Sequence, residues 1–138
     1  MSAWPQAWVV DANVLVSAVL TPGGTCDQII RAAVDGKIRR AWNAPMVAEY
    51  RAVLLRPKFG LSTTAVSALL AAFGPAGQVS LREVPPLPDP DDEVFLAAAL
   101  ATADKILVTG NRAHFPPGRC APVRVLSPAE AVQELVKP

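Results

Sequence analysis

Cysteine and histidine, on which most zinc sites and disulfide frameworks are built, are scarce in this sequence. Its 138 residues include two cysteines, Cys26 and Cys120, and one histidine, His114. Two cysteines are too few for a disulfide framework, and neither they nor the single histidine have the paired spacing of a zinc site. We therefore expect both cysteines to be buried apolar residues, and we expect any metal site to use oxygen ligands.

Long apolar segments and a strong excess of one charge are also missing. The longest apolar run, residues 94–101, is shorter than the roughly 20 residues that a membrane-spanning helix needs, and residues 1–6 lack the pattern of a secretory signal. The sequence thus predicts a cytoplasmic protein without a membrane span. Its net charge of +1 gives no overall attraction to nucleic acid, so RNA binding would require local basic patches.

Apolar residues, in contrast, are abundant. Hydrophobic residues make up 51% of the chain and charged residues 18%, which supplies enough apolar surface for one packed core. The length corresponds to a single domain, which we expect to span residues 1–138. In so short a chain, this apolar fraction leaves some apolar surface exposed after one core is filled, which predicts a homodimer. We expect its contacts to be made by the helices predicted at 25–36 and 62–73.

Short apolar runs alternate with helical patterns along the chain. Capping boxes are expected at Thr25 with Gln28 and at Ser127 with Glu130. Strands alternating with helices predict an α/β fold, with layers of helices around a mainly parallel central sheet. The expected strands are residues 8–10, 38–42, 79–84, 106–109 and 123–126. The expected helices are residues 13–20, 25–36, 43–55, 62–73, 91–103 and a last helix from 128.

Polar side chains stand where functional groups gather in an open parallel sheet, beyond the carboxyl ends of the strands. Asp11 follows the first strand, Asn111 follows strand 106–109, and Asp92 begins the helix that leads into that strand. Glu49 lies at the border of the apolar stripe of its helix. Carboxylates that converge raise one another's pKa unless a divalent cation such as Mg²⁺ or Mn²⁺ compensates. Such an ion activates water and neutralises phosphodiester charge, the chemistry of metal-dependent nucleases.

At these residues the sequence resembles the PIN-domain family, metal-dependent ribonucleases that include the VapC-like toxins of bacterial toxin–antitoxin pairs. The resemblance covers nearly the whole chain, and its motifs are specific in their order rather than singly. They are Val9–Ala18, Glu49 with Val53–Leu54 and Arg56–Phe59, Asp89–Leu96, Leu107–Asn111 and Val123–Glu130.

The resemblance implies a three-layer α/β/α sandwich of the PIN type and a set of site residues. Asp11, Glu49 and Asp92 correspond to acidic residues that hold Mg²⁺ or Mn²⁺ and act in catalysis, and Asn111 stands at a fourth catalytic position that is often Asp. The family also implies an RNA substrate, a homodimer and inhibition by a cognate antitoxin protein. The function predicted is therefore that of a metal-dependent endoribonuclease, the toxin of such a pair.

Two departures from the family pattern keep other interpretations open. Ala12 stands where the family usually has Thr or Ser, and His114 stands where many members carry a second Asp. A non-catalytic PIN scaffold that binds RNA or a protein partner is therefore an alternative. An aspartyl phosphotransferase with Asp11 as nucleophile is weaker, because Asn13 stands where such enzymes place a second Asp. His114 itself is expected to be a surface-loop residue.

Two residues are candidate substrate contacts. Arg112 directly follows Asn111, so an RNA strand could pass beside it, and Asn13 lies close to Asp11 in the sequence. Structural roles compete with functional ones for the neighbouring acids: Asp91 and Glu93 suit the positive end of a helix dipole, and Asp89 suits a turn.

Overall fold

The computed structural model describes residues 5–72, 77–80 and 82–136. Within them, four strands form one sheet in the order β2-β1-β3-β4, and every neighbouring pair is parallel. The strands are β1 (Gln6–Val10), β2 (Ile38–Arg40), β3 (Ile106–Val108) and β4 (Arg124–Leu126).

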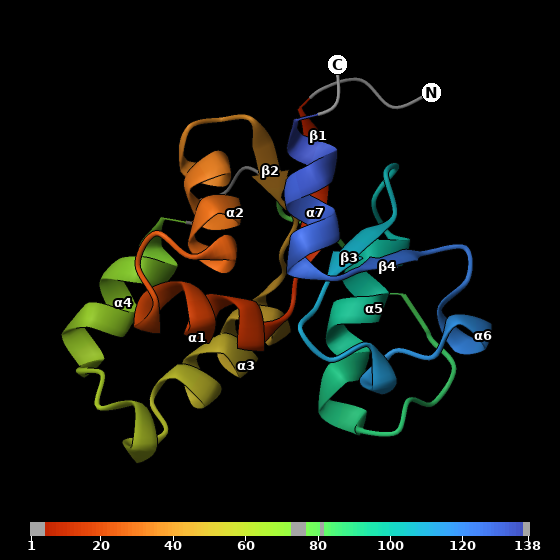
Figure 1. Ribbon diagram of the computed structural model, residues 1–138. Coiled ribbons are helices and arrows are strands. Elements are labelled where there is room, and N and C mark those ends of the chain that lie inside the picture. Colours follow the sequence, from red (N-terminus) through yellow and green to blue (C-terminus); the bar gives the residue numbers. More distant parts are fainter. Residues whose placement is uncertain (1–4, 73–76, 81, 137–138) are drawn as a thin grey trace.

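Helices cover both faces of this sheet (Figure 1). Helix α2 packs against α7 in one layer and α3 packs against α5 in the other, while α1 contacts both α2 and α3. This arrangement confirms the predicted three-layer α/β/α sandwich. The α-helices are α1 (Ala12–Leu20), α2 (Thr25–Val34), α3 (Ala44–Leu54), α4 (Thr63–Ala71), α5 (Glu93–Leu100), α6 (Pro117–Cys120) and α7 (Pro128–Leu135). Short 3₁₀ helices are η1 (Pro57–Phe59), η2 (Pro90–Asp92) and η3 (Arg112–His114).

The two central strands are apolar on both sides because both of their faces are covered. Trp8, Val9 and Val10 of β1 are buried, as are all three residues of β3. Continuous apolar runs of this kind are typical of parallel sheets between helical layers. The described residues contain no helix that is both long and apolar enough to span a membrane.

The order of the strands reverses between β1 and β3, and the carboxyl ends of these two strands mark the switch point of the sheet. From β1 the chain continues to β2 on one side, whereas β3 lies on the other side of β1 and leads outward to β4. The backbone N–H of Asp11 donates to the Val108 carbonyl over 2.9 Å, so the ladder continues past the end of β1. Ligands bind such α/β sheets at this switch point, and Asp11 stands directly on it.

Several predicted elements differ from the observed ones. Residues 79–84 were expected as a strand, but their described part forms none, and Gln78 makes only an isolated bridge with Trp42. The capping box at Thr25 is wrong, since Gly24 is the N-cap and provides no side-chain hydrogen bond, whereas the box of Ser127 with Glu130 is confirmed. Phe73, the expected end of a helix, lies outside the described residues. Cys120 is buried as expected, but Cys26 is partly exposed.

Candidate functional site

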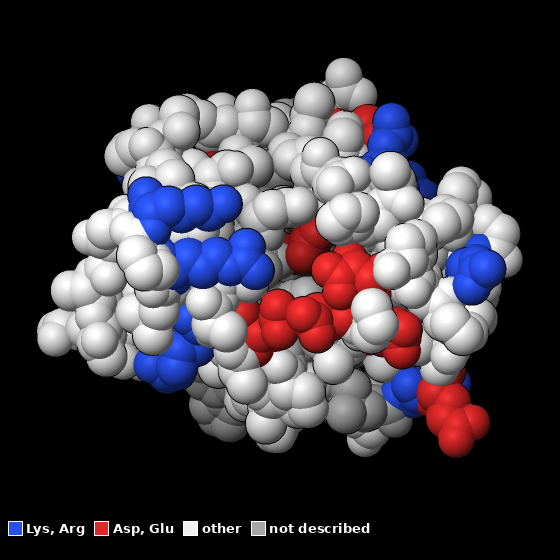
Figure 2. Space-filling model, turned by 90° about the horizontal axis from the view of Figure 1, so that it is seen from below, with Lys and Arg blue, Asp and Glu red and all other residues white. Residues whose placement is uncertain are grey.

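Five carboxylate side chains line one cavity of about 160 Å³, which we call the acidic cavity. Figure 2 shows acidic side chains gathered at the centre of this face of the molecule. Five acids against Arg56 and one imidazole give the cavity a negative charge, which attracts cations. The lining residues are Asp11, Ala12, Asn13, Glu49, Val53, Arg56, Asp89, Asp91, Asp92, Phe95 and His114.

Asp11 is held in place by hydrogen bonds to both of its carboxylate oxygens. It is the N-cap of α1, and its Oδ1 accepts from the Ala12 N–H over 2.7 Å. Its Oδ2 accepts from the Thr109 hydroxyl, also over 2.7 Å, which links the ends of β1 and β3. Burial raises the pKa of Asp11, while these two hydrogen bonds oppose the rise. The carboxylate is thus fixed in orientation, with lone pairs left for a further partner.

Thr109 is a residue of the site that sequence reasoning missed. It is completely buried, and besides donating to Asp11 its hydroxyl accepts from the Asn111 N–H over 3.1 Å. Tyr50 acts in a similar way from α3, because its buried hydroxyl donates to the carbonyl of Val10 at the end of β1. A hydroxyl residue directly after the apolar run 106–108 was the available sequence signal for Thr109.

Thr109→Val tests this support of Asp11. Valine keeps the volume and the β-branch but removes the donor to a buried carboxylate oxygen, so we expect a loss of about 1–3 kcal/mol in the free energy of unfolding. Urea denaturation at pH 7 measures the loss, and Thr109→Ser, which keeps the hydroxyl, should recover most of it. A Thr109→Val protein as stable as the wild type would contradict the role given to this hydrogen bond.

Asp92 is a buried acid of the cavity with a strongly raised pKa. It ends η2 and is 9% exposed, and within the described residues its Oδ2 accepts no hydrogen bond. His114 Nδ1 lies 3.1 Å from this oxygen, and its interaction with Asp92 opposes the rise in the pKa of that carboxyl. Burial first, and then repulsion by Asp11 and Asp89, raise the pKa of Asp92 to about 6. At neutral pH it is therefore a largely ionised, buried carboxylate that a cation would stabilise.

Glu49 reaches the same cavity from α3, where it is half-buried. Burial raises the pKa of Glu49, repulsion from Asp91 adds to the rise, and the nearby Arg56 opposes it. Asp11, Glu49 and Asp92, which come from three separate segments, are thus brought to one cavity, as the sequence predicted. Whether they act there in catalysis stays a prediction.

The neighbouring acids have local structural contacts. Asp89 accepts from the Asp91 N–H over 2.9 Å as the N-cap of η2, and Glu93 accepts from the Leu87 N–H over 3.3 Å. Asp89 and Asp91 nevertheless line the acidic cavity. Asp89 therefore combines the expected turn with a contribution to the negative charge of the site.

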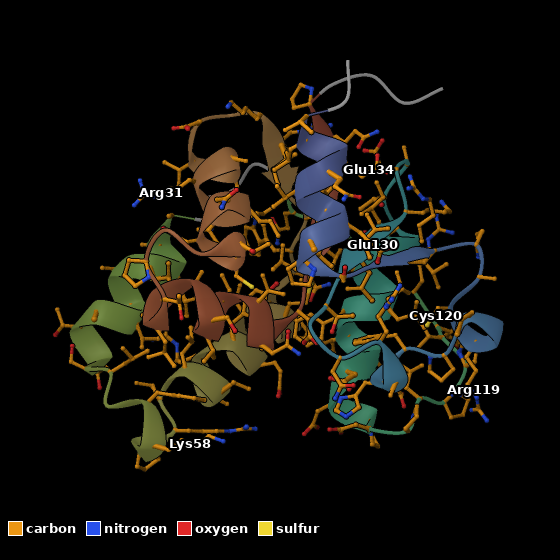
Figure 3. All side chains as sticks on the ribbon, in the orientation of Figure 1. Arg31, Lys58, Arg119, Cys120, Glu130 and Glu134 are labelled. Carbon is orange, nitrogen blue, oxygen red and sulfur yellow. The ribbon has the colours of Figure 1, made fainter. Side chains whose placement is uncertain are left out.

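The two substrate-contact candidates and Asn111 are placed differently from one another. Asn13 lines the cavity and its Oδ1 accepts from the Gly110 N–H over 3.1 Å. Asn111 is exposed and is not among the described lining residues. Arg112 forms a salt bridge of 2.9 Å with Glu130, which Figure 3 shows on α7, and lines a different cavity beside β4. Arg56, to which no role was given, lines the acidic cavity instead.

The donor groups of the cavity fit a hard divalent cation. Within the residues that the structure describes, no three carboxylate, imidazole or thiol groups form a ready-made metal-binding group. The chemistry is nevertheless suitable, because Asp11, Glu49 and Asp92 offer carboxylate oxygens, the ligands of Mg²⁺ and Mn²⁺. The buried Asp92 Oδ2, which lacks a hydrogen bond from the described residues, is the strongest indication that a cation belongs there.

Comparison with known proteins agrees with this geometry. A family model described as PIN domain matches residues 7–113, which include all but the first residue of β1, the acidic residues of the cavity and Thr109. The match ends one residue before His114. No curated protein matches the chain.

Proposed function

The chain belongs to the PIN domain family, whose members are typically nucleases, and we propose that it is a Mg²⁺- or Mn²⁺-dependent endoribonuclease that hydrolyses RNA phosphodiester bonds. The observation that carries the proposal is the acidic cavity, in which Asp11, Glu49 and Asp92 meet at the switch point of a parallel sheet. Clustered, partly buried carboxylates with raised pKa values are costly to a fold and mark candidate functional sites.

In this proposal Asp11, Glu49 and Asp92 hold the cation. When bound, a divalent ion lowers the pKa of water and neutralises charge on the phosphodiester. Thr109 keeps Asp11 in its orientation through the 2.7 Å hydrogen bond. Ala12 lines the cavity with a methyl group alone and offers the cation no ligand atom from its side chain.

Basic side chains beside the cavity suit the RNA backbone. Arg56 lines the cavity, and Lys58 lies two residues further on in η1, with its Nζ 5.1 Å from the centre of the Phe59 ring. Figure 2 shows basic side chains next to the acidic ones on the same face, and Figure 3 shows Lys58 on the lower side of the molecule, the side that Figure 2 views. Positive charges at this position would bind substrate phosphates. Asn13 remains a candidate contact, whereas the salt bridge of Arg112 to Glu130 makes Arg112 the weaker one.

The test of the proposal is cleavage of a mixed RNA pool by the purified chain, with Mn²⁺, with Mg²⁺ and with EDTA. We expect fragments with either metal and intact RNA with EDTA. RNA that is bound but not cut under any of these conditions would instead favour the non-catalytic PIN scaffold. Asn111→Ala should reduce cleavage only modestly, because the side chain lies outside the cavity lining.

We further propose that the nuclease is the cytoplasmic toxin of a toxin–antitoxin pair, inhibited by a cognate antitoxin protein. Its sequence resemblance to VapC-like toxins supports this role. Inhibition would require the partner to cover the acidic cavity or the basic side chains beside it. Cleavage that continues unchanged in the presence of the protein encoded next to this chain would contradict the pairing.

A homodimer is part of the same proposal. Val34, at the end of α2, is 69% exposed, and Leu20, at the end of α1, is 50% exposed. Exposed apolar side chains on this scale suit a protein–protein contact. Light scattering at tens of micromolar is therefore expected to give twice the chain mass of 14.5 kDa, and Val34→Asp should shift the protein toward the monomer. A wild-type monomer under these conditions would contradict the prediction.

A further inference from the structure

Among the described residues that line the acidic cavity, His114 is the one whose side chain has a nitrogen that can bind a metal ion. The other candidate ligands are carboxylate oxygens. Its Nδ1 lies 3.1 Å from Asp92 Oδ2, and its side chain is 43% exposed compared with 12% for Asp92. Sequence reasoning treated this histidine as a surface-loop residue. The structure instead places its imidazole in the lining of the acidic cavity, beside the buried Asp92.

The backbone of His114 is held by its own loop. The backbone N–H of His114 donates to the Asn111 carbonyl over 3.2 Å, and the backbone N–H of the next residue, Phe115, donates to the Arg112 carbonyl over 3.0 Å. Phe115 is completely buried and anchors the end of η3 in the core. The salt bridge of Arg112 with Glu130 ties the other side of η3 to α7. His114 is therefore held beside Asp92 by the fold and not by the contact between their side chains alone.

The distance between the two side chains is that expected for two ligands of one ion. In octahedral coordination with bonds of 2.0–2.1 Å, adjacent donor atoms lie about 2.8–3.0 Å apart. The separation of Nδ1 and Oδ2 is 3.1 Å, close to this value. A cation bound by both atoms would take the place of a proton shared between them.

We propose that His114 Nδ1 is a ligand of the divalent ion and makes the site favour transition-metal ions such as Mn²⁺ over Mg²⁺. The inference rests on the proposed metal-dependent function, and it corrects the expectation that the ligands are all oxygens. Mg²⁺ takes oxygen ligands and keeps its waters, whereas imidazole suits first-row transition ions. Replacing one oxygen position with a nitrogen therefore shifts the preference between the two ions.

Pulsed electron paramagnetic resonance of bound Mn²⁺ tests the inference directly. The chain has a single histidine, so in tag-free protein an imidazole ¹⁴N coupled to the metal can come from His114 alone. We expect directly coordinated ¹⁴N in the wild type, its loss in His114→Ala, and its retention in Lys37→Ala, a change at an exposed residue outside the acidic cavity. Bound Mn²⁺ without a directly coordinated nitrogen would overturn the proposal. His114 would then only position Asp92 and would not bind the ion.

Calorimetric titration gives a second readout that separates this inference from the proposed function. His114→Ala is expected to weaken Mn²⁺ binding about 10-fold and Mg²⁺ binding much less, and His114→Asp should restore binding in favour of Mg²⁺. Equal losses for both ions would overturn the role of His114 while leaving the metal site intact. A folded wild type that binds neither ion would overturn the metal-dependent function itself, and the inference with it.

Discussion

Asp11→Asn is expected to reduce Mn²⁺-dependent RNA cleavage by on the order of 100-fold or more. Loss of a residue that only supports a metal ligand typically costs about 10–100-fold, so removing the charge of a ligand should cost at least as much. Asparagine keeps the size of the side chain and an oxygen that can accept from the Ala12 N–H, so the fold should be retained. Initial rates of cleavage of one labelled RNA measure the effect.

The matched control for this change is Asp35→Asn. Asp35 is an exposed residue at the C-cap of α2 and is not among the residues that line the acidic cavity. Asp35→Asn removes the same charge from the chain. It should leave the rate of RNA cleavage within about 2-fold of the wild type, since substitutions of exposed residues have little effect on the fold. Asp11→Asn that cleaves as fast as Asp35→Asn would show that Asp11 has no part in the reaction.

Asp92→Asn is expected to raise the metal-free stability at pH 7 and to abolish most of the stabilisation by Mn²⁺. Asp92 has a pKa of about 6 in the folded protein, above its ordinary value of 3.8. The folded state therefore binds this proton more tightly than the unfolded state does. The stabilisation by protonated Asp92 is complete below about pH 4 and is lost as the pH rises through 6. The neutral side chain of the variant does not suffer this loss, so its advantage should grow between pH 4 and pH 7.

Metal binding should show the opposite change in the same experiment. A ligand at 100 times its dissociation constant stabilises the folded state by about 2.7 kcal/mol, and this gain depends on an ionised Asp92. Thermal melting at pH 7 and pH 5, with and without Mn²⁺, is the measurement. The wild type should gain less from Mn²⁺ at pH 5, where protons compete for Asp92. Equal Mn²⁺ shifts in the wild type and Asp92→Asn would contradict the assignment of Asp92 as a ligand.

The fold was predictable because its signals are local. The apolar runs of β1 and β3 are continuous since both faces of a parallel sheet are covered, and this pattern is visible in the sequence. Residues 79–84, whose apolar pattern is interrupted by polar residues, were predicted as a strand, but their described part forms none, since pairing depends on a neighbour that the pattern does not reveal. The helix expected from Asp91 begins as η2 because Pro90 opens a tight 3₁₀ turn before α5.

The site was predictable only in part, because some of its contacts join segments that are far apart in the sequence. Asp11 and Asp92 could be placed from the ends of strands and helices, but the bond from Thr109 to Asp11 joins residues far apart in the sequence. Arg112 was assigned by its nearness to Asn111. In a 3₁₀ helix, with three residues per turn, residues two positions apart point in different directions. Arg112 therefore reaches Glu130 on α7, whereas His114 faces the cavity.

The central claim is that the acidic cavity binds the divalent ion on which the nuclease depends. Calorimetric titration of Mn²⁺ into the wild type and into the triple variant Asp11→Asn, Glu49→Gln, Asp92→Asn tests it most directly, with circular dichroism to show that both proteins are folded. The wild type is expected to bind Mn²⁺ and the folded triple variant to show no measurable binding. Equal binding by the two proteins would place the ion elsewhere and contradict the account.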